Sequence, residues 1–264
     1  MIKPTCEDTF LIKKRDLKNN YFSMVFKTYS RVDQCQPGHF VHVHIPSTDI
    51  FFRRAMSVAG VLVESGEIEV IFKVVGRGTR LLSMLHPGDR VNFLGPLGVS
   101  FKLPKKSEKA IMVAGGVGFP PLFYMATEMV RRGYDPKNIE FFYGGRSVSD
   151  ILERTRIKKL GVTFHPVTED GSYGEKGLVT GPVERYIKSG DKAKMRLYGC
   201  GPDGMLRAVN ELGLRLGVPG QLSLEAPMPC GVGICLGCVV PLVKGGYARV
   251  CQDGPVFEIG EVAL

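Results

Sequence analysis

The stretch "AIMVAGGVGFPPLFYMATEMVRRG", residues 110–133, decides the fold class. It opens with an apolar run, turns through glycines and continues past two prolines to Gly133. The apolar run predicts a buried strand. Prolines at the start and a glycine at the end predict a helix over residues 119–133. A strand that leads through a tight glycine turn into a helix is the repeating unit of a parallel sheet.

The same pattern continues toward the carboxyl terminus. Strands are predicted at 138–145, 162–168 and 194–201, with helical segments between or after them, including residues 202–217. Alternating strands and helices predict a parallel α/β sheet that binds ligands at the carboxyl ends of its strands.

The first hundred residues have a different sequence pattern. They contain short runs rich in Val, Ile, Phe and Tyr, separated by turn signals such as Pro37-Gly38 and Pro87-Gly88. Six or so strands predict a small antiparallel β-barrel, with its clearest runs at residues 21–30, 39–45, 57–64 and 67–75. We therefore expect three parts: a barrel domain over 1–103, an α/β domain over 104–225 and a cluster-binding subdomain over 226–264.

Composition excludes several classes of protein. The chain has 264 residues, 44% hydrophobic and 23% charged, which is ordinary for a globular protein. The formal charge of +9 comes from scattered basic pairs such as Lys105-Lys106 without aromatic interleaving, so nucleic-acid binding is not expected. The first ten residues, MIKPTCEDTF, carry charge and lack the apolar core of a secretion signal, which predicts a cytosolic protein.

Two uncharged stretches, 110–127 and 226–243, are each 18 residues long, the length at which a membrane span is considered. Glycines and prolines interrupt both, so neither would keep its backbone hydrogen-bonded in lipid. No membrane span is expected.

Four of the seven cysteines form a motif near the carboxyl terminus: Cys230, Cys235, Cys238 and Cys251. The first three have C-x4-C-x2-C spacing, as in plant-type [2Fe–2S] proteins. The intervening glycines permit a loop that wraps closely around a cluster. A structural zinc site and four unliganded thiols remain alternatives. Cys6 and Cys35 are expected to be small apolar packing residues.

Glycine-rich and basic segments indicate two nucleotide sites. "FFRRAMS" (51–57) places Arg54 three residues before Ser57 on a predicted barrel strand, and "GRGTRLLS" (76–83) is a glycine turn that enters a helix at Thr79. A cation and free backbone N–H groups suit a pyrophosphate. "AGGVGFPP" (114–121) and "YGCGPDGM" (198–205) each follow a predicted strand, as a dinucleotide site requires. A structural role for Arg54 and a packing role for Cys200 remain open.

In this order the segments resemble the ferredoxin reductase family of flavoproteins. They resemble more closely the electron-transfer subunits of type B dihydroorotate dehydrogenase, especially in "PCGVGICLGC" (229–238) and "RVCQDGPVF" (249–257). The resemblance implies that FAD contacts the barrel, that the cysteine quartet holds a [2Fe–2S] cluster and that NAD binds the sheet. The implied flavin residues are Arg54, Ala55, Met56, Ser57, Ile71, Phe72, Lys73, Gly78 and Thr79.

The nicotinamide motifs of the family match Gly115, Gly116, Gly118, Cys200, Gly201 and Pro202, and "EDGSYG" (169–174) resembles a loop that meets the nicotinamide nucleotide. Ala55 stands where the family usually has proline. Arg146 either meets the 2′-phosphate of NADP or forms a surface salt bridge.

The resemblance also implies a function in pyrimidine (UMP) biosynthesis. Electrons from dihydroorotate, oxidised at an FMN on a separate catalytic subunit, would pass through the cluster and FAD to NAD+, in a heterotetramer. No residue of this chain is then needed as a catalytic acid or base. One alternative is the small subunit of a ferredoxin:NADP+ oxidoreductase, which Cys230 argues against because aspartate would favour it there. A non-catalytic zinc or iron–sulfur scaffold is another.

Overall fold

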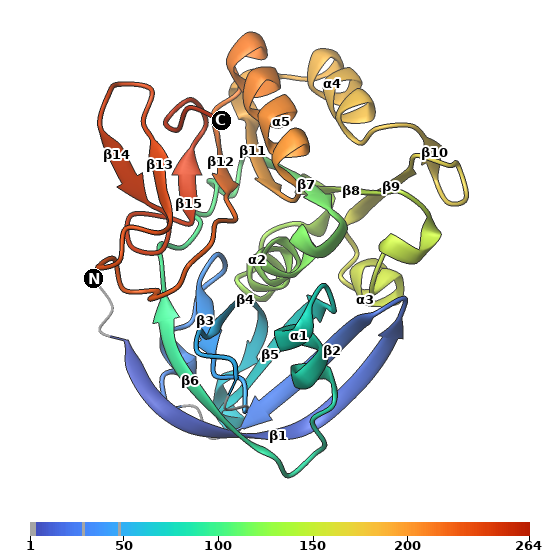
Figure 1. Ribbon diagram of the computed structural model, residues 1–264. Coiled ribbons are helices and arrows are strands. Elements are labelled where there is room, and N and C mark those ends of the chain that lie inside the picture. The colour runs from blue at the N-terminus through green and yellow to red at the C-terminus, as the bar shows by residue number, and fades with distance from the viewer. Residues whose placement is uncertain (1–3, 28–29, 47–48) are drawn as a thin grey trace.

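The amino-terminal strands close into an antiparallel barrel in the computed structural model, which describes residues 4–27, 30–46 and 49–264. The strands follow the order β1-β2-β5-β4-β3-β6 around the barrel (Figure 1). The predicted barrel is confirmed, although residues 28 and 29 of one expected strand lie outside the described residues. The strands are β1 (Thr5–Lys18), β2 (Tyr21–Lys27), β3 (Phe40–Val43), β4 (Arg54–Leu62), β5 (Glu67–Lys73) and β6 (Arg90–Leu97).

The side chains of β3 alternate between the interior of the barrel and the outer face, which the rest of the chain covers. Val41 and Val43 belong to the apolar cluster inside the barrel, together with Val58 of β4. Phe40 packs instead with the carboxyl-terminal part of the chain. Because side chains of a strand alternate between its two faces, His42 shares the outward face with Phe40. Both faces of this strand are buried.

The second half of the chain forms a seven-stranded sheet of order β10-β9-β8-β7-β11-β12-β15. Its pairings are parallel except for β12 with β15. The direction of strand order reverses between β7 and β11, where doubly wound sheets bind ligands. The strands are β7 (Lys109–Gly115), β8 (Ile139–Gly145), β9 (Thr163–Thr168), β10 (Glu175–Lys176), β11 (Met195–Cys200), β12 (Gly220–Ser223) and β15 (Val256–Glu258).

Helices cover both faces of this sheet. On one face α2 packs between the sheet and the barrel (Figure 1), and α4 and α5 pack against the other. The predicted helix at 119–133 is confirmed as α2 followed by a left-handed Gly133 with φ of 74°. The helices are α1 (Arg77–Ser83), α2 (Phe119–Arg131), α3 (Arg154–Lys159), α4 (Thr180–Ser189) and α5 (Asp203–Leu216).

Short elements complete the chain. The strands β13 (Val239–Pro241) and β14 (Tyr247–Arg249) form a two-stranded hairpin. It lies between Cys238 and Cys251 in the chain. Single 3₁₀ turns lie at Val32–Gln34, Val63–Ser65, Gly116–Gly118, Pro136–Asn138, Val148–Asp150 and Lys192–Lys194.

Three strands of the sheet and the exposure of one cysteine differ from the prediction. The strands β10, β12 and β15 have only two to four residues, too few to display a periodic pattern. Cys6 is exposed, so its interpretation as a packing residue is wrong: on β1 its side chain points outward, and its sulfur lies 3.2 Å from Asn92 Oδ1. Cys35 is buried, as expected.

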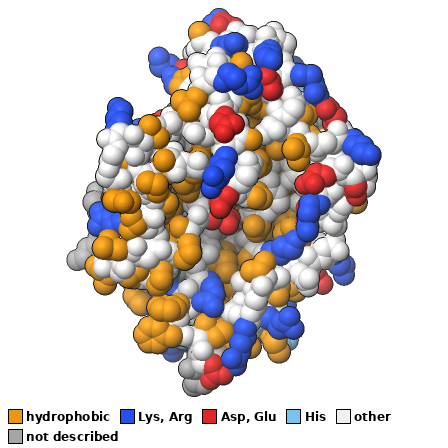
Figure 2. Space-filling model, turned by 45° about the horizontal axis from the view of Figure 1, so that its top comes forward, with side chains coloured by type: hydrophobic (Ala, Val, Ile, Leu, Met, Phe, Trp, Pro, Cys, Tyr) orange, Lys and Arg blue, Asp and Glu red, His pale blue; other side chains and the backbone are white. Residues whose placement is uncertain are grey.

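The uncharged stretches belong to ordinary folded elements. Residues 110–127 form β7, the glycine turn and most of α2, while 226–243 contain the cysteine loop and β13. Across the residues described, no helix is both long and apolar enough to cross a membrane. Figure 2 shows Lys and Arg side chains spread over the surface, as the scattered basic pairs predict.

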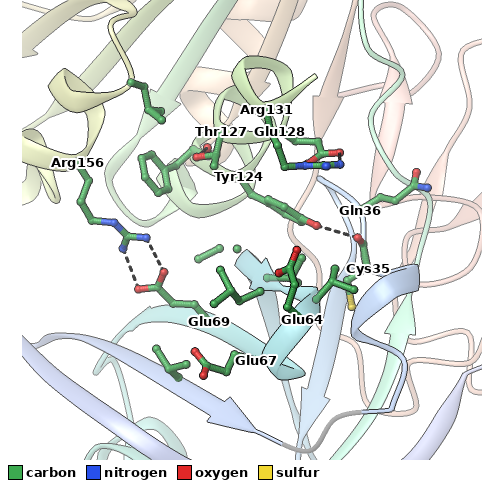
Figure 3. Close-up of a pocket in the computed structure, with 18 of the residues that line it drawn as sticks. Cys35, Gln36, Glu64, Glu67, Glu69, Tyr124, Thr127, Glu128, Arg131 and Arg156 are labelled. Carbon is green, nitrogen blue, oxygen red and sulfur yellow. Dashed lines mark hydrogen bonds and ion pairs between the residues drawn. The ribbon is translucent and has the colours of Figure 1, made fainter. Parts of the chain in front are cut away.

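Ion pairs tie the barrel to the sheet domain beside a large hollow (Figure 3). Arg156 of α3 donates two hydrogen bonds to Glu69 of β5, at 2.9 and 2.8 Å, and Ser23 donates a third at 2.6 Å. Burial alone would raise the pKa of Glu69, but the Arg156 hydrogen bonds and charge, with Ser23 and Arg15, outweigh it and lower the pKa. Tyr124 of α2 adds a hydrogen bond of 2.8 Å to the Cys35 carbonyl.

We predict that Glu69→Gln lowers the free energy of unfolding by about 2 kcal/mol at pH 7, because it removes the buried carboxylate that accepts hydrogen bonds from the partly exposed Arg156 and Arg15. Chemical denaturation would measure the loss. Since the folded-state pKa is lowered from 4.5, this stabilisation is present above pH 4.5 and disappears as the pH falls. Glu67→Gln on the same strand is the control and should change stability by less than about 0.5 kcal/mol. Equal losses for both variants would contradict the prediction.

Candidate functional site

A hollow of about 330 Å³ lies between the barrel and the ends of the sheet strands, and we call it the barrel hollow. Its barrel wall is made by β4, β5 and α1, and its other wall by Val117, Cys200, residues 223–226, Met228 and Pro255. The structure brings together eight of the nine residues implied for flavin, and these line the barrel wall: Arg54, Ala55, Met56, Ser57, Ile71, Phe72, Lys73 and Thr79.

The ninth residue, Gly78, lies directly against Arg54. A methyl group at Gly78 would stand 2.8 Å from the Arg54 guanidinium nitrogens. The Thr79 hydroxyl accepts the N–H groups of Val75 and Gly76 at 3.0 and 3.2 Å, which holds the turn that opens α1. The turn and the cation therefore converge, an arrangement that suits a pyrophosphate.

A second hollow, of about 600 Å³, lies at the reversal point between β7 and β11, and we call it the sheet hollow. Gly115, Gly116 and Pro202 line it, whereas Cys200 lines the barrel hollow. Gly201 lines neither hollow; a methyl there would meet Met205 Cε at 2.6 Å. The two hollows share three lining residues, so they adjoin: Lys73, Val75 and Val117.

Gly118 serves close packing. A methyl group at this position would overlap the carbonyl of Cys200, at the end of the neighbouring strand β11. The turn after β7 thus approaches β11 as closely as backbone permits, and only glycine allows it.

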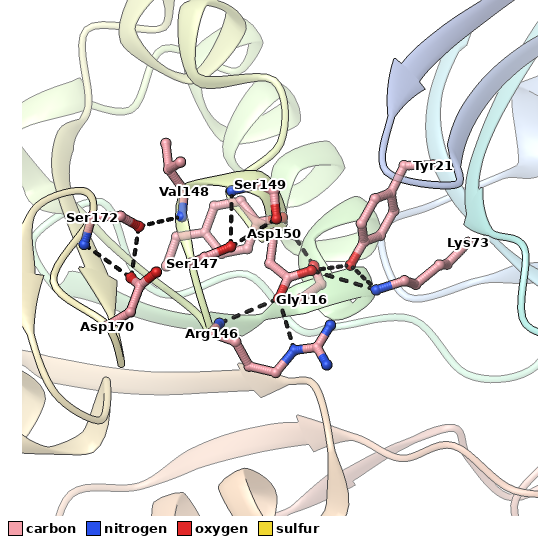
Figure 4. Close-up of polar contacts among 11 residues, drawn as sticks. Tyr21, Lys73, Gly116, Arg146, Ser147, Val148, Ser149, Asp150, Asp170 and Ser172 are labelled. Atoms are coloured by element: carbon pink, nitrogen blue, oxygen red, sulfur yellow. Dashed lines mark hydrogen bonds and ion pairs between the residues drawn. The ribbon is translucent and has the colours of Figure 1, made fainter.

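A polar network borders the sheet hollow (Figure 4). Asp150 Oδ1 accepts the Tyr21 hydroxyl at 2.9 Å and lies 3.4 Å from Lys73 Nζ, while its Oδ2 accepts Arg146 Nε at 3.1 Å. Burial alone would raise the pKa of Asp150, but hydrogen bonds from Arg146 and Tyr21 and the charge of Lys73 lower it. Arg146 therefore forms the salt bridge that the sequence analysis left as one alternative. Glu169, the first residue of the 169–174 loop, also lines the sheet hollow.

The four motif cysteines meet in one loop as two pairs. The Cys235 thiol acts on the pKa of Cys230, and the Cys238 thiol on the pKa of Cys251, so the thiols neighbour each other as these two pairs. Backbone N–H groups point at the sulfurs over 3.4 Å, from Val232 to Cys230, Gly237 to Cys235 and Cys251 to Cys238. Burial alone would raise the pKa of Cys230, but N–H groups of Val232, Cys235 and Ile234 lower it to about 6.

This arrangement fits two iron atoms better than one zinc ion. A tetrahedral zinc site gathers its ligands around a single point. In the described ranges, no group of three or more His, Cys, Asp or Glu side chains is placed to hold one metal ion. Two thiol pairs with amide donors aimed at their sulfurs match a [2Fe–2S] cluster, in which each iron takes two cysteines.

No sequence signal pointed to the wall contributed by residues 223–226 and Met228, by Phe40 and by Val117. Ser223 ends β12, and strand ends of a parallel sheet face its ligand site. Recognising β12 would have found this wall. Phe40 and Val117 carry no local signal, because only the approach of the two domains places them there.

Three known domain families match successive parts of the chain. Residues 8–117 match an oxidoreductase FAD-binding domain, 112–211 an oxidoreductase NAD-binding domain and 225–263 the iron–sulfur cluster binding domain of dihydroorotate dehydrogenase B. Fold and site thus define a ferredoxin reductase-like oxidoreductase with FAD, NAD and iron–sulfur sites.

Individual relatives show which family of oxidoreductases the chain belongs to. A dihydroorotate dehydrogenase B (NAD(+)) electron transfer subunit from Geobacillus thermodenitrificans is 39% identical over 87% of both chains, and one from Streptococcus mutans is 35% identical over 98% of both. The chain belongs to the family of dihydroorotate dehydrogenase B electron transfer subunits.

Solved structures agree with the fold. An NADH-dependent reduced ferredoxin–NADP oxidoreductase has a TM-score of 0.84 and 26% identity, covering 96% of this chain and 89% of that chain. A ferredoxin reductase of carbazole 1,9a-dioxygenase has a TM-score of 0.70 and 22% identity, covering 82% and 67%.

We predict that Gly118→Ala lowers the free energy of unfolding by about 2 kcal/mol, because the Cys200 carbonyl is backbone and cannot rotate away. Chemical denaturation provides the measurement. Gly181→Ala in α4 is the control, since its methyl would meet only the far end of Arg185 at 3.7 Å. An unchanged Gly118→Ala protein would show that the turn has room to move.

Proposed function

We propose that this chain transfers electrons to NAD+ from dihydroorotate, which is oxidised on an FMN-containing catalytic partner subunit during pyrimidine biosynthesis. The relatives are named as electron transfer subunits of an NAD+-dependent dihydroorotate dehydrogenase. Oxidation to orotate releases two electrons and two protons. NAD+ takes both electrons and one proton, and the second proton goes to solvent.

The residues of this chain provide one site for each group. Arg54, Ser57 and the 76–79 turn would hold FAD in the barrel hollow, and the glycines after β7 would hold NAD in the sheet hollow. The cysteine quartet would hold the [2Fe–2S] cluster. FAD, when bound, exchanges a hydride with nicotinamide and single electrons with an iron–sulfur cluster. The chain itself binds and orients these groups.

The observation that carries the proposal is that the three sites are contiguous. The barrel and sheet hollows share Lys73, Val75 and Val117. Met228 lines the barrel hollow, and Cys230 follows two residues later. A nicotinamide, a flavin and a cluster in these sites would lie in the order that stepwise electron transfer needs.

The names of the relatives, rather than the setting of Arg146, support NAD+ over NADP+. A 2′-phosphate is held by cations that are free to turn toward it. Arg146 donates to Asp150, and Asp150 also accepts Tyr21. Arg146 is held toward Asp150 only through Nε, so it is the NAD(+) in the relatives' names that weighs against the alternative of a ferredoxin:NADP+ oxidoreductase subunit, despite the similar fold of the NADH-dependent reduced ferredoxin–NADP oxidoreductase.

The cluster loop offers a surface for the catalytic partner. Ile234 is 80% exposed and Leu236 62%, and Val243 and Tyr247 of the adjoining hairpin are also exposed. Figure 2 shows hydrophobic side chains gathered on the left, the side on which Figure 1 draws β13 and β14. Apolar side chains beside a redox centre suit a docking surface. We propose that the partner covers this loop in a cytosolic heterotetramer of two copies of each subunit.

Reconstitution tests the function. Mixing the purified chain, loaded with iron, sulfide and FAD, with the FMN-containing catalytic subunit should give dihydroorotate-dependent NADH, followed at 340 nm, and little NADPH from NADP+. An Arg54→Gln variant should lose most of its FAD while retaining iron, and should form no NADH. Arg80→Gln on α1 carries the same charge change and should keep both. A colourless zinc protein, or a loaded complex that forms no NADH, would contradict the proposal.

We predict that Ile234→Glu weakens binding to the catalytic subunit about 30-fold, because a buried apolar contact at an interface centre contributes about 2 kcal/mol. Calorimetric titration of the two subunits measures it. Leu62→Glu, at an exposed position on the barrel, is the matched control and should bind like the unmodified chain. Equal affinity for both variants would place the interface elsewhere.

A further inference from the structure

His42 is a fully buried histidine on β3. Its exposure is 0%, and neither Nδ1 nor Nε2 has a hydrogen-bond partner among the residues that the structure describes. A buried polar group without a partner costs about 1–3 kcal/mol. Such a group in a native protein calls for an explanation, and a bound group is one.

The nitrogen-bearing edge of this ring faces the cysteine loop. A methyl group on Gly231 would stand 2.6 Å from His42 Cε1, 2.8 Å from Nδ1 and 2.9 Å from Nε2. Gly231 has a φ of 71° and directly follows Cys230, the first of the four cysteines. The ring therefore packs against the backbone that would wrap the cluster.

Burial and the nearby Arg53 cation keep the His42 ring neutral. Burial, and then the charge of Arg53, lower the pKa of His42 to about 4. The Arg53 guanidinium donates to the His42 carbonyl at 3.4 Å and to Asn92 Oδ1. It therefore bonds to the backbone of His42 and not to the nitrogens of its ring. A neutral imidazole carries one N–H donor.

The position of His42 also connects the two redox sites. In the register of β3 with β4, His42 is opposite Ala55, which lines the barrel hollow. The loop's own amides already point at Cys230, Cys235 and Cys238. His42 is a side-chain donor from the barrel placed beside the same loop.

We propose that His42 donates a hydrogen bond from its ring to a sulfur of the iron–sulfur cluster and thereby raises the cluster's reduction potential. The inference rests on the proposed function in so far as the four cysteines hold a [2Fe–2S] cluster. A hydrogen bond to a sulfur stabilises the reduced cluster more than the oxidised one, because reduction adds negative charge. The partnerless nitrogen is then satisfied by the group that the loop holds.

His42→Phe in the cluster-loaded chain tests this, because it keeps an aromatic ring and removes the donor. A redox titration followed by electron paramagnetic resonance should show about a tenfold shift of the cluster toward its oxidised form, which equals about 59 mV for one electron. His42→Asn and His42→Gln place an amide near the Nδ1 and Nε2 positions, and the one that matches the donor should restore the potential.

His39→Phe is the matched control. His39 is a buried barrel histidine whose Nδ1 already accepts Gln36 N–H at 3.1 Å, so its removal should leave the cluster potential unchanged. Equal potentials for His42→Phe and the unmodified chain would overturn the inference, and so would equal shifts for both variants.

A measurement on the unmodified chain keeps the test decisive even if His42→Phe loads no iron. Chain labelled with ¹⁵N-histidine should show hyperfine coupling between a ring nitrogen and the reduced cluster. Absence of coupling in a fully loaded sample would overturn the inference. All readouts use the isolated chain, so a failure of dihydroorotate-dependent NADH formation leaves them unaffected, whereas a chain without iron would defeat the proposed function itself.

Discussion

The arrangement of the sites depends on one backbone pairing, the antiparallel contact of β12 with β15. Leu222 pairs with Phe257 and Ser223 with Val256, and Leu224 N–H continues the ladder to the Pro255 carbonyl at 2.9 Å. The whole cysteine segment is thus a long loop whose two ends are fastened to the same edge of the sheet. A loop fastened at both ends has few ways to move away from the barrel hollow that its first residues line.

The second constraint is the seam between barrel and sheet. Glu69 with Arg156, and Asp150 with Tyr21 and Lys73, join residues of the two domains through partly buried ion pairs and hydrogen bonds. Arg156 engages both oxygens of Glu69, which fixes orientation as well as distance, while Tyr21 and Lys73 both reach Oδ1 of Asp150. Because of this seam, Lys73 and Val117, from different domains, can line both hollows.

The two carboxylates between the domains are both held in their charged form. The carboxylates Glu69 and Asp150 are buried, which opposes ionisation, yet cations and hydroxyl donors hold their pKa values low. His42 reaches the opposite result, since it is buried beside a cation and stays neutral. Glu69 and Asp150 are therefore charged where the two domains meet. His42 is a neutral donor where the loop of four cysteines approaches the barrel.

The sequence by itself determined the local units and the chemistry of the ligands. Cysteine spacing, the glycine turns after β7 and β11 and the alternating barrel strands depend on neighbours within a few residues, so they can be read directly. Only the packing of the two domains placed Cys200 in the wall of the barrel hollow, Asp150 against Tyr21 and β15 at the edge of the sheet. Those outcomes depend on contacts between residues far apart in the chain, such as Tyr21 and Asp150, separated by 129 positions, and on strands too short to leave a periodic signal.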